Sequence, residues 1–232
     1  MTPYLTVPFS LSDEAWNLAH EMIKPIIDDW TKNSPIAGGL YNQAGVSDKP
    51  KYSDEWKQTI VWKEIETFTK SVGLTDGELQ FFIYRVTPNY ADPRGNPHLD
   101  ALGVGEDIPR NPVKVRFNIP LFGEDNAKMR WWNKDMHHPD INISDFIRPD
   151  GSKGKRLDVR GANINEKYIN VGPPEWETDT LWELNKKASF LKTDILHCVD
   201  WDGQHLRAVL SARFLKQDWD TIEKYRKTLQ SN

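Results

Sequence analysis

Two histidines and one aspartate form the most chemically distinctive pattern in the sequence. His98 and Asp100 lie in the run Asn96-Pro97-His98-Leu99-Asp100, and His197 lies far downstream in a strand-like run. Because side chains alternate along a strand, His98 and Asp100 are expected on one face. If His197 meets them there, two imidazoles and a carboxylate leave cis positions open on a non-haem Fe(II). The pattern therefore predicts an iron site at which a bidentate ligand and O2 could bind together.

Each part of this pattern is a weak signal by itself. An H-x-D tripeptide is more often a turn or a surface pair, and a lone histidine such as His197 is more often structural. The interpretation gains weight from the arginine that follows. Arg207 lies ten residues after His197, and the polar segment between them suits a hairpin turn. We therefore expect residues 195–201 and 206–214 to form two paired antiparallel strands.

The strand at 206–214 carries cationic and polar side chains on one face. Alternation places Arg207, Val209, Ser211 and Arg213 on that face, and Ala208, Leu210, Ala212 and Phe214 on the other. A guanidinium inside a barrel needs an anionic partner, because an unpaired buried charge is too costly. A carboxylate bound in bidentate fashion would be a suitable partner.

In order and approximate spacing, His98, Asp100, His197 and Arg207 match the signature of the 2-oxoglutarate and Fe(II)-dependent oxygenase superfamily. The chain resembles that superfamily over about residues 80–215, and its short stand-alone form looks like bacterial and phage-encoded members. The resemblance implies a double-stranded β-helix, or jelly roll. It implies Fe(II) held by the two histidines and the aspartate, with 2-oxoglutarate chelating the iron and Arg207 binding its distal carboxylate. With O2, such an enzyme hydroxylates its substrate and releases succinate and CO2.

Three further residues are candidates for the co-substrate site. Arg207 and Arg213 have an R-x5-R spacing that resembles nucleic-acid demethylases of the superfamily, so Arg213 is either a second contact or a member of a surface ion pair. Ser211 is either a hydrogen-bonding partner or a plain strand serine. Asn118 lies on the inward face only if the polar alternants of the strand at 113–122 point to the site. The opposite orientation, with the apolar alternants inward, is equally compatible with the sequence.

The composition narrows the classes of function. With 232 residues, 38% hydrophobic and 28% charged, the chain suits one folded domain over residues 1–232. A net charge of −4 makes nucleic acid an unfavourable general partner. No apolar run approaches the roughly 20 residues of a membrane span, and no signal peptide is apparent. The single cysteine, Cys198, fits a cytoplasmic location.

The expected architecture is α+β and mainly β, with N-terminal helices packed on one sheet and a helix at the C-terminal end. Helices are expected from Ser12 to Trp30, with a kink or break at Pro25, and from about Ser53 to Gly73. A final helix should reach about Gln230. Short strands should occupy the remainder, and the polar residues 133–178 are expected to be an insertion with little regular structure. The expected strands are 3–10, 80–86, 113–122, 129–132, 188–192, 195–201 and 206–214.

Three other kinds of function compete with a hydroxylase of an unknown small molecule, peptide or protein. The first is a cupin-like protein that binds a metal or ligand without oxidation, and the second is nucleic-acid demethylation within the same superfamily. The third, a zinc hydrolase, would use the same ligands but leave Arg207 without a role. The intact ligand set together with Arg207 favours the oxygenase.

Overall fold

The computed structural model of the chain describes residues 2–33, 57–84, 113–122, 128–135, 137, 139, 141–147, 153–159, 180–183, 187–200, 207–214 and 216–231. The helices in these ranges are α1 (Asp13–Asn33), α3 (Ile60–Val72) and α4 (Trp219–Ser231). The strands are β1 (Tyr4–Thr6), β2 (Gly77–Tyr84), β3 (Val115–Phe122), β4 (Lys128–Asp135), β5 (Ile141–Ile147), β6 (Lys153–Val159), β7 (Thr180–Glu183), β8 (Ser189–Lys192), β9 (Ile195–Asp200) and β10 (Arg207–Phe214).

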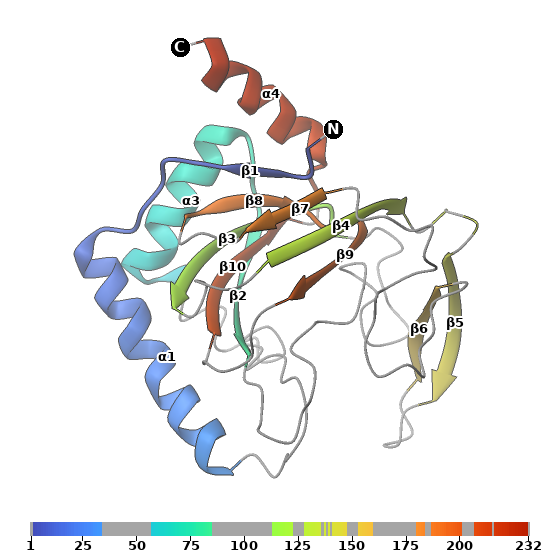
Figure 1. Cartoon of the computed structure of the whole chain (residues 1–232). Helices are drawn as coiled ribbons and strands as arrows, with labels where there is room; N and C mark the ends of the chain where they lie inside the picture. The colour runs from blue at the N-terminus through green and yellow to red at the C-terminus, as the bar shows by residue number, and fades with distance from the viewer. Residues whose placement is uncertain are drawn as a thin grey trace.

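The described strands form three antiparallel sheets. The largest has five strands in the order β1-β8-β3-β10-β2, and a second has three in the order β7-β4-β9. β5 and β6 pair only with each other among the described strands. Figure 1 shows α1 and α3 beside the five-stranded sheet, with β4, β7 and β9 on its other side. The expected mainly antiparallel α+β layout is confirmed.

The main hydrophobic core lies between the helices and one face of the five-stranded sheet. Alternate residues of β3 and β10 enter it, together with side chains from all three helices. Alternation along these strands sends the intervening residues to the opposite face, here called the inner face. The expectation that helices pack on one sheet is therefore confirmed. The core residues of the two strands are Val115, Phe117, Ile119, Leu121, Ala208, Leu210, Ala212 and Phe214.

The structure refines two expectations about the helices. α1 continues through Pro25 to Asn33, so of the expected kink or break the break is wrong, although proline removes one backbone hydrogen bond from a helix interior. Burial of Ala15, Ala19 and Ile23 against the core helps to offset that cost. α3 begins at Ile60, where the Thr59 hydroxyl caps the backbone N–H of Trp62; the expected start near Ser53 lies outside the described residues. It ends as predicted at Gly73, whose left-handed φ of 95° suits glycine.

The expected insertion and the expected hairpin also differ from the structure. Residues 141–147 and 153–159, inside the insertion, pair as the hairpin β5–β6. The polar composition of residues 133–178 as a whole obscured this pair of strands. β9 and β10 do not pair with each other, so that prediction is wrong. β9 pairs with β4, whereas β10 lies between β2 and β3 in the other sheet.

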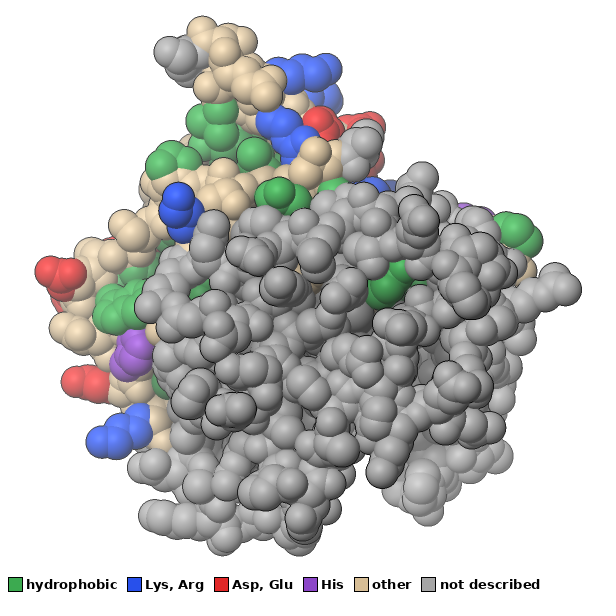
Figure 2. Space-filling model, viewed as in Figure 1, with side chains coloured by type: hydrophobic (Ala, Val, Ile, Leu, Met, Phe, Trp, Pro, Cys, Tyr) green, Lys and Arg blue, Asp and Glu red, His purple; other side chains and the backbone are tan. Residues whose placement is uncertain are grey.

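The outer surface of the described part of the chain has mixed charge. Figure 2 shows acidic and basic side chains interspersed over the helical layer. Among the described residues, no helix combines the length and apolar character that crossing a membrane requires. The coloured part of Figure 2 shows no extended surface of a single charge.

Candidate active site

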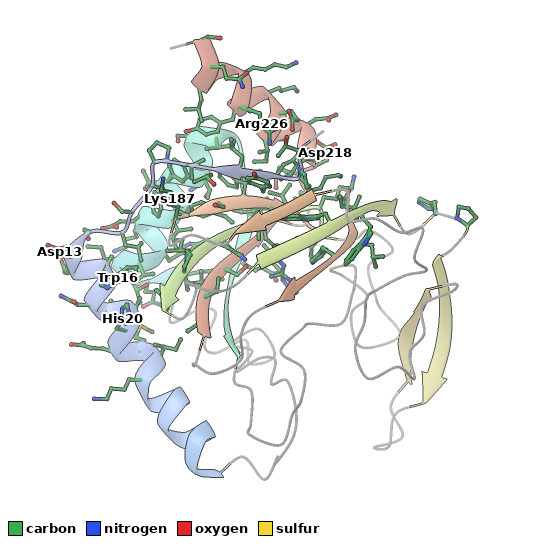
Figure 3. The ribbon with its side chains drawn as sticks, viewed as in Figure 1. Asp13, Trp16, His20, Lys187, Asp218 and Arg226 are labelled. Atoms are coloured by element: carbon green, nitrogen blue, oxygen red, sulfur yellow. The ribbon has the colours of Figure 1, made fainter. Side chains whose placement is uncertain are left out.

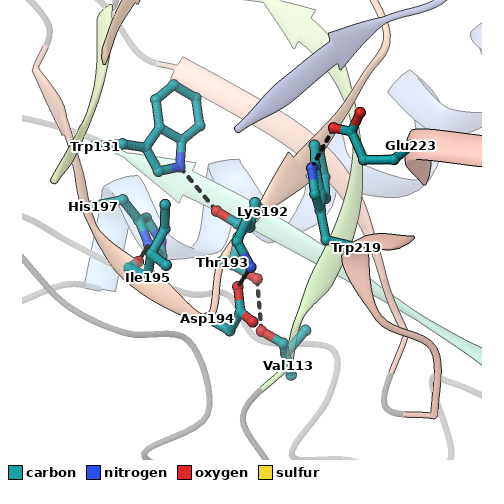
Figure 4. A network of polar contacts seen from close by, with 9 residues as sticks. All are labelled: Val113, Trp131, Lys192, Thr193, Asp194, Ile195, His197, Trp219 and Glu223. Carbon is teal, nitrogen blue, oxygen red and sulfur yellow. Dashed lines mark hydrogen bonds and ion pairs between the residues drawn. The ribbon is translucent and has the colours of Figure 1, made fainter. Parts of the chain in front are cut away.

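His197 is a buried histidine on β9, only 3% exposed. Its Nδ1 lies 2.8 Å from the backbone carbonyl oxygen of Ile195, as Figure 4 shows. A carbonyl oxygen only accepts, so Nδ1 carries the proton and donates. In the neutral ring, Nε2 then holds the lone pair.

This arrangement fits a metal ligand. Metal-binding histidines usually donate their second ring N–H to a carbonyl or carboxylate, which fixes the tautomer and the ring orientation. The same bond would also satisfy a purely structural buried histidine. His197 is thus chemically suited to coordinate a metal through Nε2. The other two expected ligands, His98 and Asp100, lie outside the described residues, and within the described ranges no three His, Cys, Asp or Glu side chains cluster as a metal site.

The inner face of the five-stranded sheet carries a polar row opposite the helical core. Asn118 and Ser211 are direct cross-strand partners, and Ser189 and Thr6 extend the row toward the sheet edge. Ser211 is fully buried and donates from Oγ to Asn118 Oδ1 at 2.6 Å. The polar alternants of β3 therefore point away from the helical core, which is the orientation on which the assignment of Asn118 depended.

Arg116 adds a guanidinium to this row. It is 8% exposed, and its Nη1 donates to Ser211 Oγ at 3.4 Å. Because arginine only donates, Ser211 must accept from Arg116 and direct its own proton to Asn118. In this arrangement Asn118 Oδ1 accepts the proton of Ser211, and the two N–H donors of Asn118 Nδ2 take no part in that bond. The row can thus present donors to a carbonyl or carboxylate oxygen.

Arg213 is joined to an acidic neighbour. Its Nε and Nη2 both lie 2.6 Å from Oε2 of Glu78, its cross-strand partner on β2. The two side chains are 29% and 39% exposed. Of the two alternatives for Arg213, the ion pair is the one observed in these contacts, and a further role toward a co-substrate stays a prediction.

Arg207 is the first residue of β10 and the cross-strand partner of Tyr84. Strand alternation gives position 207 the same parity as Val209 and Ser211. Because β9 and β10 belong to different sheets, Arg207 and His197 come from opposite layers rather than from one hairpin.

The sequence did not single out Tyr4 or the contacts of Trp131. Trp131, the cross-strand partner of His197, is 1% exposed and stacks on Tyr4 from the other sheet. Trp131 and Trp132 are adjacent on β4, so alternation sends their two rings to opposite faces of the sheet. Nothing local in the sequence pointed to the N-terminal strand as the partner.

Comparisons with known proteins add information on the fold. No family model matches the sequence. A curated relative, mouse xylosyltransferase 1, is 28% identical in a 102-residue alignment that covers 41% of this chain and 10% of that protein. The chain thus spans about a tenth of that relative, which assigns it no activity.

Two solved structures share most of the architecture. The epimerase SnoN, solved in complex with Fe3+, alpha ketoglutarate and nogalamycin RO, has a TM-score of 0.50 at 12% identity, over 92% of this chain and 78% of its own. The non-heme alpha ketoglutarate dependent carbocyclase SnoK from nogalamycin biosynthesis has a TM-score of 0.50 at 9% identity, over 92% and 79%. At these identities the likeness concerns the fold. The resemblance expected from the sequence is confirmed at that level: the chain shares its fold with solved Fe- and 2-oxoglutarate-dependent oxygenases.

Proposed function

We propose that this protein is a non-haem Fe(II) and 2-oxoglutarate-dependent dioxygenase built on a jelly roll. The observation that carries the proposal is His197. It is buried, its Nδ1–H is tied to a backbone carbonyl, and it lies in a fold shared with alpha ketoglutarate-dependent enzymes. The antiparallel five- and three-stranded sheets are compatible with the jelly roll.

The site residues have distinct roles in this proposal. His98, Asp100 and His197 hold Fe(II), and Arg207 binds the distal carboxylate of 2-oxoglutarate. Asn118, oriented by Ser211, donates to an oxygen of the bound co-substrate. When bound, iron and 2-oxoglutarate supply the oxidising chemistry with O2. One oxygen atom enters succinate, CO2 is released, and the other oxygen enters the hydroxylated product.

The substrate is an unidentified small molecule, peptide or protein side chain. Nucleic acid is disfavoured by the net charge of −4 and by the engagement of Arg213 with Glu78. Asp100 as a ligand supports hydroxylation over halogenation, since halogenating members lack that carboxylate. The alternative is a protein that binds a metal without oxygenase activity, and the experiments below distinguish it from a dioxygenase.

The direct test is an anaerobic titration with Fe(II), with and without 2-oxoglutarate. We expect a visible metal-to-ligand charge-transfer band that requires both components, because a bidentate co-substrate occupies open iron positions. The band should disappear in His98→Ala and Asp100→Ala and persist in His20→Ala, a control at the surface of α1. Metal binding without any band, in folded protein, would favour the cupin-like alternative.

The roles of the two arginines make a second prediction. Arg207→Ala should weaken 2-oxoglutarate binding by roughly 10- to 100-fold, because a hydrogen bond to a charged group contributes roughly 1.5–3 kcal/mol. Arg213→Ala should leave that affinity nearly unchanged, since its guanidinium engages Glu78. Isothermal titration of each Fe(II)-loaded variant measures the effect. The opposite ranking would transfer the carboxylate-binding role to Arg213.

A further inference from the structure

Trp131 links the two larger sheets at the level of His197. It belongs to β4 in the three-stranded sheet, and its Nε1 donates to the Lys192 carbonyl oxygen of β8 at 2.9 Å (Figure 4). Its ring stacks on Tyr4 of β1, with centroids 5.8 Å apart and an interplanar angle of 20°. Both contacts reach the five-stranded sheet. The indole is therefore fixed from the layer opposite its own strand.

Trp131 is the direct cross-strand partner of His197 on the neighbouring strand. The ladder between β4 and β9 is regular from Lys128 to Trp131, and the pair Trp131–His197 is its last regular step. Beyond it the register shifts, and the next pair is Asp135 with Ile195. Such irregularities re-aim side chains and are common beside active sites. Directly opposed residues have Cβ atoms about 4.5–5.5 Å apart, so the Trp131 side chain borders the space beside the imidazole.

Tyr4 is itself held in place by α4. Arg226 donates from Nη2 to the carbonyl oxygens of Tyr4 at 2.7 Å and Thr2 at 3.0 Å. Glu223 lies 3.3 Å from Nη1 of the same guanidinium and accepts from Trp219 Nε1 at 2.9 Å. Figure 3 labels Arg226 on α4, near β1. Because β1 has only three residues, these bonds add substantially to the contacts that fix its position.

We propose that Tyr4 and Trp131 are positioning residues that set the orientation of the His197 imidazole, with Arg226 holding Tyr4 in register. The inference rests on the proposed metal-binding role of His197. A change in the residues that orient a metal ligand typically lowers metal affinity by 10- to 100-fold. The C-terminal helix thereby supports the metal site through a series of contacts: Arg226 to Tyr4, Tyr4 to Trp131, and Trp131 to the strand of His197.

The test compares substitutions on the two faces of the five-stranded sheet. Tyr4→Leu removes the ring that stacks on Trp131 and should lower Fe(II) affinity by up to roughly 10-fold, less than the loss of a group bonded directly to a metal ligand. Tyr4→Phe retains the ring and should therefore keep the wild-type Fe(II) affinity. Phe68→Leu is the matched control, because Phe68 packs in the helical core against Phe117 and Phe190. It should reduce stability without changing Fe(II) affinity.

A second measurement does not depend on metal. In the metal-free protein, 15N NMR of the imidazole nitrogens reports the tautomer of His197 and its Nδ1–H bond to Ile195. Tyr4→Leu should perturb these signals, and Phe68→Leu should not. If wild-type protein binds no Fe(II), the proposed function fails, and the NMR comparison alone decides the positioning role. Unchanged His197 signals in folded Tyr4→Leu protein would overturn the inference.

Discussion

His197→Ala is expected to abolish formation of the Fe(II)–2-oxoglutarate charge-transfer band and to lower Fe(II) affinity by more than about 100-fold. Loss of a direct ligand should exceed the roughly 10- to 100-fold effect of disturbing an outer partner. The substitution also leaves the Ile195 carbonyl without its imidazole partner, at a cost of about 1–3 kcal/mol if the group stays buried. Anaerobic metal titration gives the affinity, and urea denaturation gives the stability.

Two further variants separate the loss of the ligand from loss of structure. His20→Ala removes a half-buried histidine of α1, whose Nδ1 lies 2.8 Å from the Trp16 carbonyl oxygen, and should retain full Fe(II) affinity. His197→Gln keeps a polar side chain of similar length, so it should fold better than the alanine variant while still binding iron weakly. Wild-type Fe(II) affinity in folded His197→Ala protein would exclude His197 as a ligand.

Phe117→Ala is expected to cost about 3–5 kcal/mol of the free energy of unfolding, the usual range for truncation of a fully buried aromatic residue. Phe117 is 0% exposed. Its ring centroid lies 4.7 Å from that of Phe190 and 5.4 Å from those of Phe9 and Phe68. The substitution opens a cavity at the junction of helices and sheet, which the rigid ladder cannot easily close.

Chemical denaturation at constant m-value measures this loss. Leu229→Ala is the control, since Leu229 is 38% exposed on α4 and surface changes usually stay within about 0.5 kcal/mol. Because Phe117 points to the helical core, folded Phe117→Ala protein should keep its Fe(II) affinity. A loss smaller than about 1 kcal/mol would show that the core can relax around the missing ring.

The fold was predictable where hydrophobic periodicity was strong. β3, β8, β9 and β10 lie where alternation or apolar runs indicated, and α3 ends at Gly73 as expected. Alternation also separated the two faces of β10 correctly, because one face must enter a dry core. The hairpin β5–β6 was missed because the polar, Pro- and Gly-containing composition of residues 133–178 as a whole outweighed the apolar residues of β5, which are Ile141, Ile143, Phe146 and Ile147.

Long-range partners account for the remaining differences. The turn-like residues 200–205 suggested that β9 and β10 pair, but β10 instead fills the position between β2 and β3. The Glu78 partner of Arg213 and the Tyr4 partner of Trp131 depend on strand register and sheet order, which spacing along the chain does not determine. Of the expected ligands, His197 has a described geometry, whereas the assignment of His98 and Asp100 stays a prediction.

The order of the five-stranded sheet has a consequence for how the chain is made. Its strands follow the order β1-β8-β3-β10-β2, so residues 207–214 supply a strand that completes both β2 and β3. Synthesis proceeds from the N-terminus at about 5–20 residues per second. β2 and β3 are therefore synthesised before β10, the strand that pairs with both of them. During that interval a growing chain presents unpaired strand edges, which favour association with other chains. We expect nascent chains that stop before residue 207 to depend on chaperones and to aggregate when released.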